Sequence, residues 1–245
     1  MKPRKHEYRT VFISDVHLGT RISQPARLLD FLKEARMRHL YLVGDIVDVT
    51  AFRRKFHWDK DHNAVVRRIL KLVKHRVKVV YIPGNHDRDM RDFAGMDFAG
   101  IEFRNRDIHT TRQRQRLLVI HGDEFDGVLR EQMMFLYTVG DYSYAAAIQV
   151  SRLVNRVTRW FGVDFSLSKY LKTKVKNVIK FINNFEKLIV YEARSANVDG
   201  VVCGHIHSPD LRVVDGKIYG NCGCWTESCS ALVEHLDGRL EVIHL

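Results

Sequence analysis

Five short polar clusters recur along the chain, and their side chains are of the types that bind metal ions. The clusters are Asp15-Val16-His17, Gly44-Asp45, Gly84-Asn85-His86-Asp87, His121-Gly122-Asp123 and Gly204-His205-Ile206-His207. Residues two apart point the same way in an extended chain, so the side chains of Asp15 and His17 could face one ion. Carboxylate and imidazole ligands together suit the borderline divalent metals Mn, Fe, Co and Zn. The clusters therefore predict a metal centre.

Further side chains would complete such a centre. The carboxylate of Asp45 could bridge two ions with its two oxygens, Asn85 offers a neutral carbonyl oxygen, and His121 offers an imidazole. His205 and His207 repeat the spacing of the first pair. A single Asp after a strand is usually a turn former, and a single His is usually a packed or surface residue. Turn chemistry does not account for five such clusters, each after an apolar stretch.

The stretches before the clusters have the pattern of buried strands in an α/β sheet. Strands are expected at residues 9–14, 40–43, 77–82, 116–120 and 198–203, and helices at 24–37 and 63–74. Residues 103–111 are expected as an edge strand paired with 116–120. The tail is expected as antiparallel sheet, with strands at 211–214, 217–219, 230–234 and 240–243 and hairpin turns at Asp215-Gly216 and Asp237-Gly238. In open α/β sheets, ligands gather beyond the carboxyl ends of the strands, where the clusters fall.

Residues 128–196 form a different kind of region. They carry two apolar stripes at helical spacing, from Val150 to Phe161 and from Val175 to Ile189, surrounded by lysines and arginines. This pattern predicts a helical cap, 128–196, inserted into a core made of residues 1–127 and 197–245. The alternative is two ordinary surface helices packed on the core. Both can hold, since one helix face can pack while another covers a site.

Composition bounds the partners and the compartment. The 245 residues are 45% hydrophobic, which is enough for one well-cored domain with an insertion. The formal net charge of +11 favours phosphate-rich partners: nucleic acid, an anionic membrane surface or a phosphorylated substrate. The alternative explanation of the net charge is a solvated basic surface that keeps the protein soluble and has no phosphate-rich partner. The start of the sequence has no secretory signal pattern, so we expect a cytoplasmic protein with reduced, buried cysteines rather than a zinc site.

Taken together, the blocks Asp15-x-His17, Gly44-Asp45-x-x-Asp48, Gly84-Asn85-His86-Asp87, His121-Gly122-Asp123 and Gly204-His205-x-His207 resemble the signature of the calcineurin-like metallophosphoesterases. The resemblance implies an α/β fold, a four-layer αββα sandwich in which helices flank two mixed β-sheets, with an inserted helical cap. It also implies two divalent metal ions, with Mn²⁺ expected and Fe, Co or Zn as alternatives.

The resemblance implies a role for each motif residue. One metal would be held by Asp15, His17, Asp45 and His207, and the second by Asp45, Asn85, His121 and His205. His86 would face the phosphate, Asp48 would orient it, and a hydroxide shared by the two ions would attack phosphorus. Asp87 and Asp123 are expected to brace the loops.

The motifs predict the type of reaction more narrowly than they predict the substrate. Serine/threonine phosphatases of this superfamily carry Arg where the chain has Val49, which counts against a protein substrate. Chain length, cap position and motif spacing are similar to the UDP-2,3-diacylglucosamine pyrophosphatases of lipid A synthesis, which implies a lipid-linked nucleotide substrate and peripheral attachment at the inner membrane. Well-known members of that branch have Arg at the position of His86. A phosphodiesterase or nuclease is the alternative enzyme, and a non-catalytic scaffold the alternative from another class.

Overall fold

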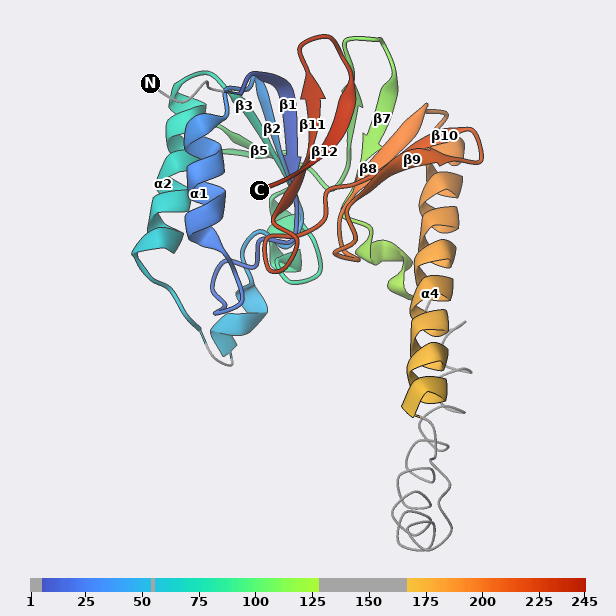
Figure 1. Ribbon diagram of the computed structural model, residues 1–245. Helices are drawn as coiled ribbons and strands as arrows, with labels where there is room; N and C mark the ends of the chain where they lie inside the picture. The colour runs from blue at the N-terminus through green and yellow to red at the C-terminus, as the bar shows by residue number, and fades with distance from the viewer. Residues whose placement is uncertain (1–5, 54–55, 128–166) are drawn as a thin grey trace, which may run out of the picture. The chain divides into compact units, whose positions relative to one another are not determined.

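The computed structural model describes residues 6–53, 56–127 and 167–245 (Figure 1). The chain divides into two compact units, one of residues 1–123 and 189–245 and the other of residues 124–188. Most of the predicted cap, residues 128–166, lies outside the described residues, so the division into core and cap stays a prediction. The described end of that region is one helix, α4 (Leu167–Ser195).

The larger sheet has seven strands in the order β12-β11-β1-β2-β3-β5-β4. Its bounds are β1 (Tyr8–Ile13), β2 (His39–Val43), β3 (Lys78–Ile82), β4 (Asp97–Phe98), β5 (Ile101–Phe103), β11 (Ser230–His235) and β12 (Leu240–His244). Strands β1, β2, β3 and β5 are parallel, whereas β11 runs antiparallel to β1 and β12 antiparallel to β11. The sheet is therefore mixed, with a parallel centre.

The smaller sheet has five strands in the order β6-β7-β8-β10-β9. Its bounds are β6 (Asp107–Thr110), β7 (Arg116–Val119), β8 (Gly200–Cys203), β9 (Asp210–Val214) and β10 (Lys217–Asn221). Strands β7, β8 and β10 are parallel, and the two edge strands are antiparallel to their neighbours. Three parallel strands thus end at one edge of this sheet.

Successive side chains of the central strands point to opposite faces of the larger sheet and enter two different hydrophobic cores. Val11 of β1 packs in the core under helices α1 (Pro25–Glu34) and α2 (Lys60–Lys74), with apolar residues such as Leu28 and Ile69. Its neighbour Phe12 points the other way, into the core between the two sheets, where it stacks on Tyr41 with ring centroids 4.9 Å apart. Residues of opposite parity face opposite sides of a strand, so both faces of the central sheet are buried. Figure 1 shows the two helices side by side on its outer face.

Most predicted elements are confirmed, including the two mixed sheets and both hairpin turns. Two predictions are wrong in part. Residues 103–111 are not one strand, since Phe103 ends β5 in the larger sheet, but β6 is the predicted edge strand and pairs antiparallel with β7 as expected. The tail is not one antiparallel sheet either, because β10 pairs in parallel with β8 while β11 and β12 belong to the other sheet. Pairing between distant segments decided both outcomes, and alternation within a segment does not encode it.

The described residues also form three short 3-10 helices: η1 (Val49–Arg53), η2 (Arg88–Phe93) and η3 (Asp123–Phe125). Within the described part of the chain, no helix combines the length and the apolar character needed to cross a bilayer.

Candidate metal centre

The five polar clusters all leave the carboxyl ends of parallel strands. Three follow β1, β2 and β3 of the larger sheet, and two follow β7 and β8 of the smaller one. Backbone hydrogen bonds join the loops: the amide of Asp15 donates to Gly44 O (3.1 Å), and the amide of Gly204 donates to His121 O (3.1 Å). The amide of His205 donates to Asp15 Oδ2 across the two sheets (2.9 Å). Parallel pairing within each sheet and the packing of the two sheets together therefore gather residues as distant in the sequence as Asp15 and His205, which are 190 positions apart.

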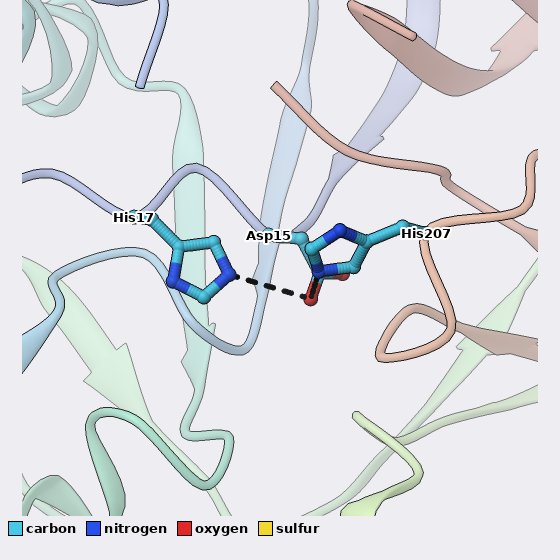
Figure 2. Close-up of side chains that lie close together, drawn as sticks. All are labelled: Asp15, His17 and His207. Carbon is cyan, nitrogen blue, oxygen red and sulfur yellow. Dashed lines mark ion pairs between the residues drawn. The ribbon is translucent and has the colours of Figure 1, made fainter. Parts of the chain in front are cut away.

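Most of the predicted ligand atoms converge on a small volume. Nε2 of His207 lies 3.1 Å from Oδ1 of Asp15, and Nε2 of His17 lies 4.0 Å from the same oxygen (Figure 2). Oδ2 of Asp45 is 3.5 Å from Nε2 of His121 and 3.9 Å from Nε2 of His17. Three groups have ligand atoms that all lie within 4.8 Å of one another: Asp15, His17 and His207; His17, Asp45 and His86; Asp15, Asp45 and His121.

Several of these atoms are buried without a hydrogen-bond partner. Of the seven such side-chain atoms among the described residues, four belong to predicted ligands: Asp15 Oδ1, His17 Nε2, Asn85 Oδ1 and His121 Nε2. A buried polar atom left unpaired costs roughly 1–3 kcal/mol, so a cluster of them is unusual in a folded protein. Converging lone pairs of nitrogen and oxygen are what a pair of divalent cations requires. The donor set therefore fits the ions that the motifs predict.

The other nitrogen of two imidazoles is held by the protein. Nδ1 of His121 is hydrogen-bonded to Val43 O at 2.9 Å, and Nδ1 of His17 lies 3.2 Å from Asp48 Oδ2. A partner on Nδ1 fixes the ring and leaves Nε2 to face a metal ion. Both rings are thus oriented with Nε2 toward the carboxylates of the cluster.

Backbone geometry sets the predicted ligands apart from the rest of the strands. Asp15, His17, Asp45, His205 and His207 have φ values of 51°, 52°, 54°, 70° and 53°, all in the left-handed region. Asp and His enter that region more readily than most residues, but the conformation still costs free energy and persists only where the surroundings enforce it. Five of the seven predicted ligands therefore have a left-handed backbone.

Glycines of the motifs make room for ligands. A Cβ at Gly84 would lie 2.6 Å from the ring of His121, and one at Gly204 would lie 2.5 Å from Asp15 Oδ2. Real Cβ atoms essentially never approach other atoms so closely. Glycine before Asn85 and before His205 is therefore a steric requirement of the centre.

Opposite charges compensate one another in the metal-free cluster. The carboxylate of Asp15, which faces Nε2 of His207, outweighs burial and raises the pKa of that imidazole to about 10. Burial alone would lower the pKa of His121, but the carboxylates of Asp45 and Asp15 outweigh burial and raise the pKa to about 10. Burial raises the pKa of Asp45, but the nearby ring of His121 outweighs it, so the pKa is lowered overall. A metal ion would take the place of these imidazole protons.

His86 and Asp48 are paired as the resemblance implied. Nδ1 of His86 is 3.0 Å from Asp48 Oδ2, and the amide of His86 donates to Asp45 Oδ1 (2.8 Å). Thr50, which the sequence analysis missed, donates from its hydroxyl to Asp48 Oδ1 at 2.6 Å. Burial raises the pKa of Asp48, but the hydrogen bonds from Thr50 and His86 lower it overall. Asp48 is thus a carboxylate placed between His17 and His86.

Asp87 and Asp123 brace the loops, which confirms the expectation for them. Buried Asp87 accepts from the amides of Gly84 (2.6 Å) and Ile46 (2.8 Å) and from the hydroxyl of Tyr81. It therefore ties the loop after β3 to the loop after β2. Asp123 accepts from Nη2 of Arg91 with both oxygens, at 2.7 and 2.8 Å. Tyr81 and Arg91 were missed because nothing in the sequence around them marks a tertiary partner.

The predicted site residues are thus nearly all gathered. Asp15, His17, Asp45, His86, His121 and His207 fall within the ligand-atom groups, and Asp48 and Asn85 lie beside them. His205 is outside those groups, although its ring centroid is 5.2 Å from that of His121. The ligand assignment stays a prediction, and His205 is its least supported member.

Comparison with known proteins decides the family. The model of the calcineurin-like phosphoesterase family matches residues 8–209, most of the chain. The chain belongs to the calcineurin-like phosphoesterase family. This calcineurin-like phosphoesterase is accordingly a hydrolase acting on phosphoester bonds, in a family that depends on two metal ions. No curated protein sequence matches it.

Solved structures resemble this calcineurin-like phosphoesterase only distantly. YfcE, a phosphoesterase from E. coli, is 14% identical with a TM-score of 0.46, over 96% of this chain and 98% of that one. Zinc-complexed Vps29 from Entamoeba histolytica is 13% identical with a TM-score of 0.43, over 96% and 97%. An archaeal phosphodiesterase is 11% identical with a TM-score of 0.44, over 96% and 99%. Likeness at this level carries no argument about substrate.

Proposed function

We propose that this phosphoesterase hydrolyses a phosphodiester or diphosphate bond with two divalent ions bound at the carboxyl ends of its parallel strands. The observation that carries the proposal is the set of buried atoms without hydrogen-bond partners on Asp15, His17, Asn85 and His121. Three of these residues, Asp15, His17 and His121, also belong to the converging ligand groups. Nothing else among the described residues satisfies those atoms, and bound cations would.

The ligand sets that we propose follow the motifs. Asp15, His17, Asp45 and His207 hold one ion, and Asp45, Asn85, His121 and His205 hold the other. Mixed carboxylate, amide and imidazole donors suit Mn²⁺, with Fe, Co and Zn as alternatives. Bound ions would supply positive charge for the phosphoryl oxygens and a water acidic enough to act as the nucleophile.

His86 would be the group that handles the leaving oxygen. Its side chain is 36% exposed, so a substrate can reach it, whereas Asp48 behind it is buried. Asp48 Oδ2 accepts a hydrogen bond from Nδ1, so Nε2 is left to face the substrate, and Nε2 carries a proton when the ring is an imidazolium. From there His86 would hydrogen-bond the phosphoryl group and pass a proton to the departing oxygen.

The substrate class that we propose is a lipid-linked nucleoside diphosphate such as UDP-2,3-diacylglucosamine. Its support is the motif spacing, the net charge of +11 and the apolar, basic pattern of residues 128–196, which suits a phosphate head joined to acyl tails or an anionic membrane surface. The second candidate is a phosphodiesterase or nuclease, which the same net charge favours.

A substrate panel tests the proposal. Metal-loaded protein is incubated with UDP-2,3-diacylglucosamine, a cyclic dinucleotide, single-stranded DNA and a small chromogenic phosphodiester, and kcat/KM is measured for each. We expect the lipid-linked diphosphate to be the best substrate and to release UMP. A higher kcat/KM for DNA or the cyclic dinucleotide would favour the second candidate, a phosphodiesterase or nuclease, over the lipid-linked substrate class. A protein that hydrolyses none of the four, with metal bound, would be a scaffold. The Asp45→Asn variant controls for contaminating hydrolases.

A further inference from the structure

Thr50 is an exposed residue whose side chain makes two hydrogen bonds beside His86. It is the second residue of the 3-10 helix η1, which follows Asp48 in the loop after β2. Its hydroxyl donates to Asp48 Oδ1 at 2.6 Å, and its oxygen lies 3.2 Å from Nδ1 of His86. The proposed function gives Thr50 no part, although Thr50 contacts both members of the His86–Asp48 pair.

Backbone hydrogen bonds hold the segment that carries Thr50. The amide of Val49 donates to His86 O at 3.1 Å, so the start of η1 is bonded to the loop after β3. The amide of Ala51 donates to Asp48 Oδ1 at 2.9 Å. The residues on both sides of Thr50 are therefore tied to the pair that its hydroxyl contacts.

The types of atoms decide which group donates to which. A threonine hydroxyl has one proton to donate, and an ionised carboxylate can only accept. Because the hydroxyl proton of Thr50 goes to Asp48 Oδ1, the hydroxyl oxygen can only accept from Nδ1 of His86. Asp48 Oδ2, 3.0 Å from the same nitrogen, is a second acceptor. Nδ1 of His86 thus carries a proton that two residues share.

The carboxylate of Asp48 is divided between two imidazoles. Its Oδ2 also lies 3.2 Å from Nδ1 of His17, whose ring stands almost perpendicular to that of His86 with centroids 4.8 Å apart. A bound ion would fix His17 from its Nε2 side, whereas the proposed ligand sets do not include His86. His86 therefore depends more on the groups around Nδ1, and Thr50 supplies the acceptor that Asp48 alone does not.

We propose that Thr50 is a positioning residue whose hydroxyl oxygen fixes the ring of His86, so that Nε2 faces the phosphoryl group. The inference rests on the proposed function, because it takes His86 as the group that handles the leaving oxygen. A misplacement of a catalytic group by about 1 Å can cost about 100-fold in rate. The alternative is that Thr50 only closes the turn at the start of η1 through Asp48, in which case its loss would leave His86 unchanged.

The test is a double-mutant cycle on the full-length, metal-loaded protein: wild type, Thr50→Val, His86→Ala and the double variant. Valine keeps the branched shape of threonine without the hydroxyl, and Asp48 Oδ1 keeps the amide of Ala51. The first readout is the affinity for inorganic phosphate, measured by calorimetry. The second is kcat on two methyl phosphodiesters, one with a phenyl leaving group and one with the better para-nitrophenyl leaving group.

We expect Thr50→Val to lower kcat on the phenyl ester by about 10–100-fold, with a smaller loss on the nitrophenyl ester. Phosphate binding should weaken in Thr50→Val and in His86→Ala, and the double variant should bind no more weakly than His86→Ala. Thr50→Ser should restore both quantities, because serine keeps the hydroxyl. Thr20→Val is the matched control: Thr20 donates to His17 O at 2.9 Å in the loop after β1, so the ratio of the two rates should stay that of the wild type.

The other outcomes separate the positioning role from the proposed function. Wild-type values in Thr50→Val, beside a loss in His86→Ala, would overturn the positioning role and leave the proposed function intact. An undiminished further loss when Thr50→Val is added to His86→Ala would also overturn it, since the hydroxyl would then act elsewhere. A wild type that hydrolyses neither ester nor any substrate of the panel would overturn the proposed function, while the phosphate cycle still decides Thr50. If His86→Ala changes neither readout, both ideas fail. Thr50→Ala takes the place of Thr50→Val if thermal melting shows that the valine variant does not fold.

Discussion

Two buried polar clusters in this protein differ in whether their polar atoms have hydrogen-bond partners. Around Glu234 on β11, every partner is in place: the carboxylate accepts from Arg9 (2.8 Å), Thr10 (2.8 Å), His109 (2.8 Å) and the amide of Arg112 (2.7 Å). In the candidate metal centre, equally buried atoms face one another without hydrogen bonds. The first cluster joins the two sheets, because Thr10 and His109 lie on different ones.

The difference teaches that burial of charge by itself marks neither stability nor chemistry. A fully paired network stabilises the fold, whereas a partly paired one is costly until a ligand completes it. Substitution should therefore separate the two clusters: one change should abolish activity with little effect on folding, and another should weaken folding with little effect on activity.

The largest expected effect is on Asp45. Asp45→Asn keeps the hydrogen bond from the amide of His86 but removes the charge and one candidate bridging oxygen. We expect the variant to lose at least one metal ion and all measurable hydrolysis, while the metal-free protein melts within a few degrees of the wild type. Metal content and thermal melting after chelation check this. A large drop in the melting temperature of the chelated variant would mean that the centre is structural, as the Glu234 cluster is.

His86→Ala should be the next most severe change. The proposed ligand sets do not include His86, so the metal content should stay that of the wild type. Loss of the proton donor should lower kcat by about 10²–10⁴-fold on a substrate with a poor leaving group. Activated chromogenic esters should be less affected, because their leaving groups need no proton. Turnover equal to the wild type on both substrates would contradict the role.

Glu234→Gln should weaken folding and leave activity unchanged, which is the opposite of the result expected for the first two variants. Burial raises the pKa of Glu234, but hydrogen bonds from His109 and the Arg112 amide lower it to about 2, against an ordinary value of 4.5. Through proton linkage, that difference corresponds to about 3 kcal/mol of stability at neutral pH. The stability is fully present above pH ~4.5 and is lost as pH falls toward ~2, because in that range the unfolded carboxyl group takes up a proton that the folded one does not.

Urea unfolding at several pH values checks the Glu234 prediction. Glu234→Gln should be about 3 kcal/mol less stable at neutral pH and should show less acid dependence than the wild type, with kcat unchanged. Glu241→Gln is the matched control, since Glu241 on the adjacent strand is 42% exposed and its ion pairs should contribute little. Equal losses in the two variants would remove the distinction between a buried network and a surface pair.

The smallest effect is expected at Arg91. Arg91→Ala breaks the two hydrogen bonds to Asp123 and so releases the loop after β7 from the loop after β3. Because neither residue is a proposed ligand, metal affinity should fall by less than about tenfold. Arg88→Ala is the control, for Arg88 is 77% exposed with only a 3.9 Å approach to Asp89. Identical metal affinity in both variants would show that the Asp123 pair does not support the centre.

The site was more predictable from the sequence than the pairing of the strands was. A polar cluster after an apolar strand is local information, and glycine beside Asp45, Asn85 and His205 marks the close approaches that the structure contains. Parallel order then follows from the intervening helices. The loops converge once the strands are parallel, so local patterns were sufficient for most of the ligand set.

What escaped prediction depends on contacts between distant residues. Glu234 meets Thr10 only because β11 pairs with β1 across 224 positions, and strand alternation does not reveal that pairing. The parallel pairing of β10 with β8 likewise brings the loop after β10 to the edge where the loop after β8 begins, although a hairpin-rich tail favours antiparallel sheet. Asp48 was expected behind His86, but its contact with His17 could not be foreseen from spacing.

The left-handed backbone at five proposed ligands also bears on how such a protein would drift if its activity were no longer selected. Glycine adopts positive φ without the penalty that Asp15, His17, Asp45, His205 and His207 incur. While the chemistry is needed, selection would retain the costlier residues; once it is not, glycine or asparagine at these positions would stabilise the fold. Loss of function in this lineage should therefore appear first as replacement of these five residues, with both cores left intact.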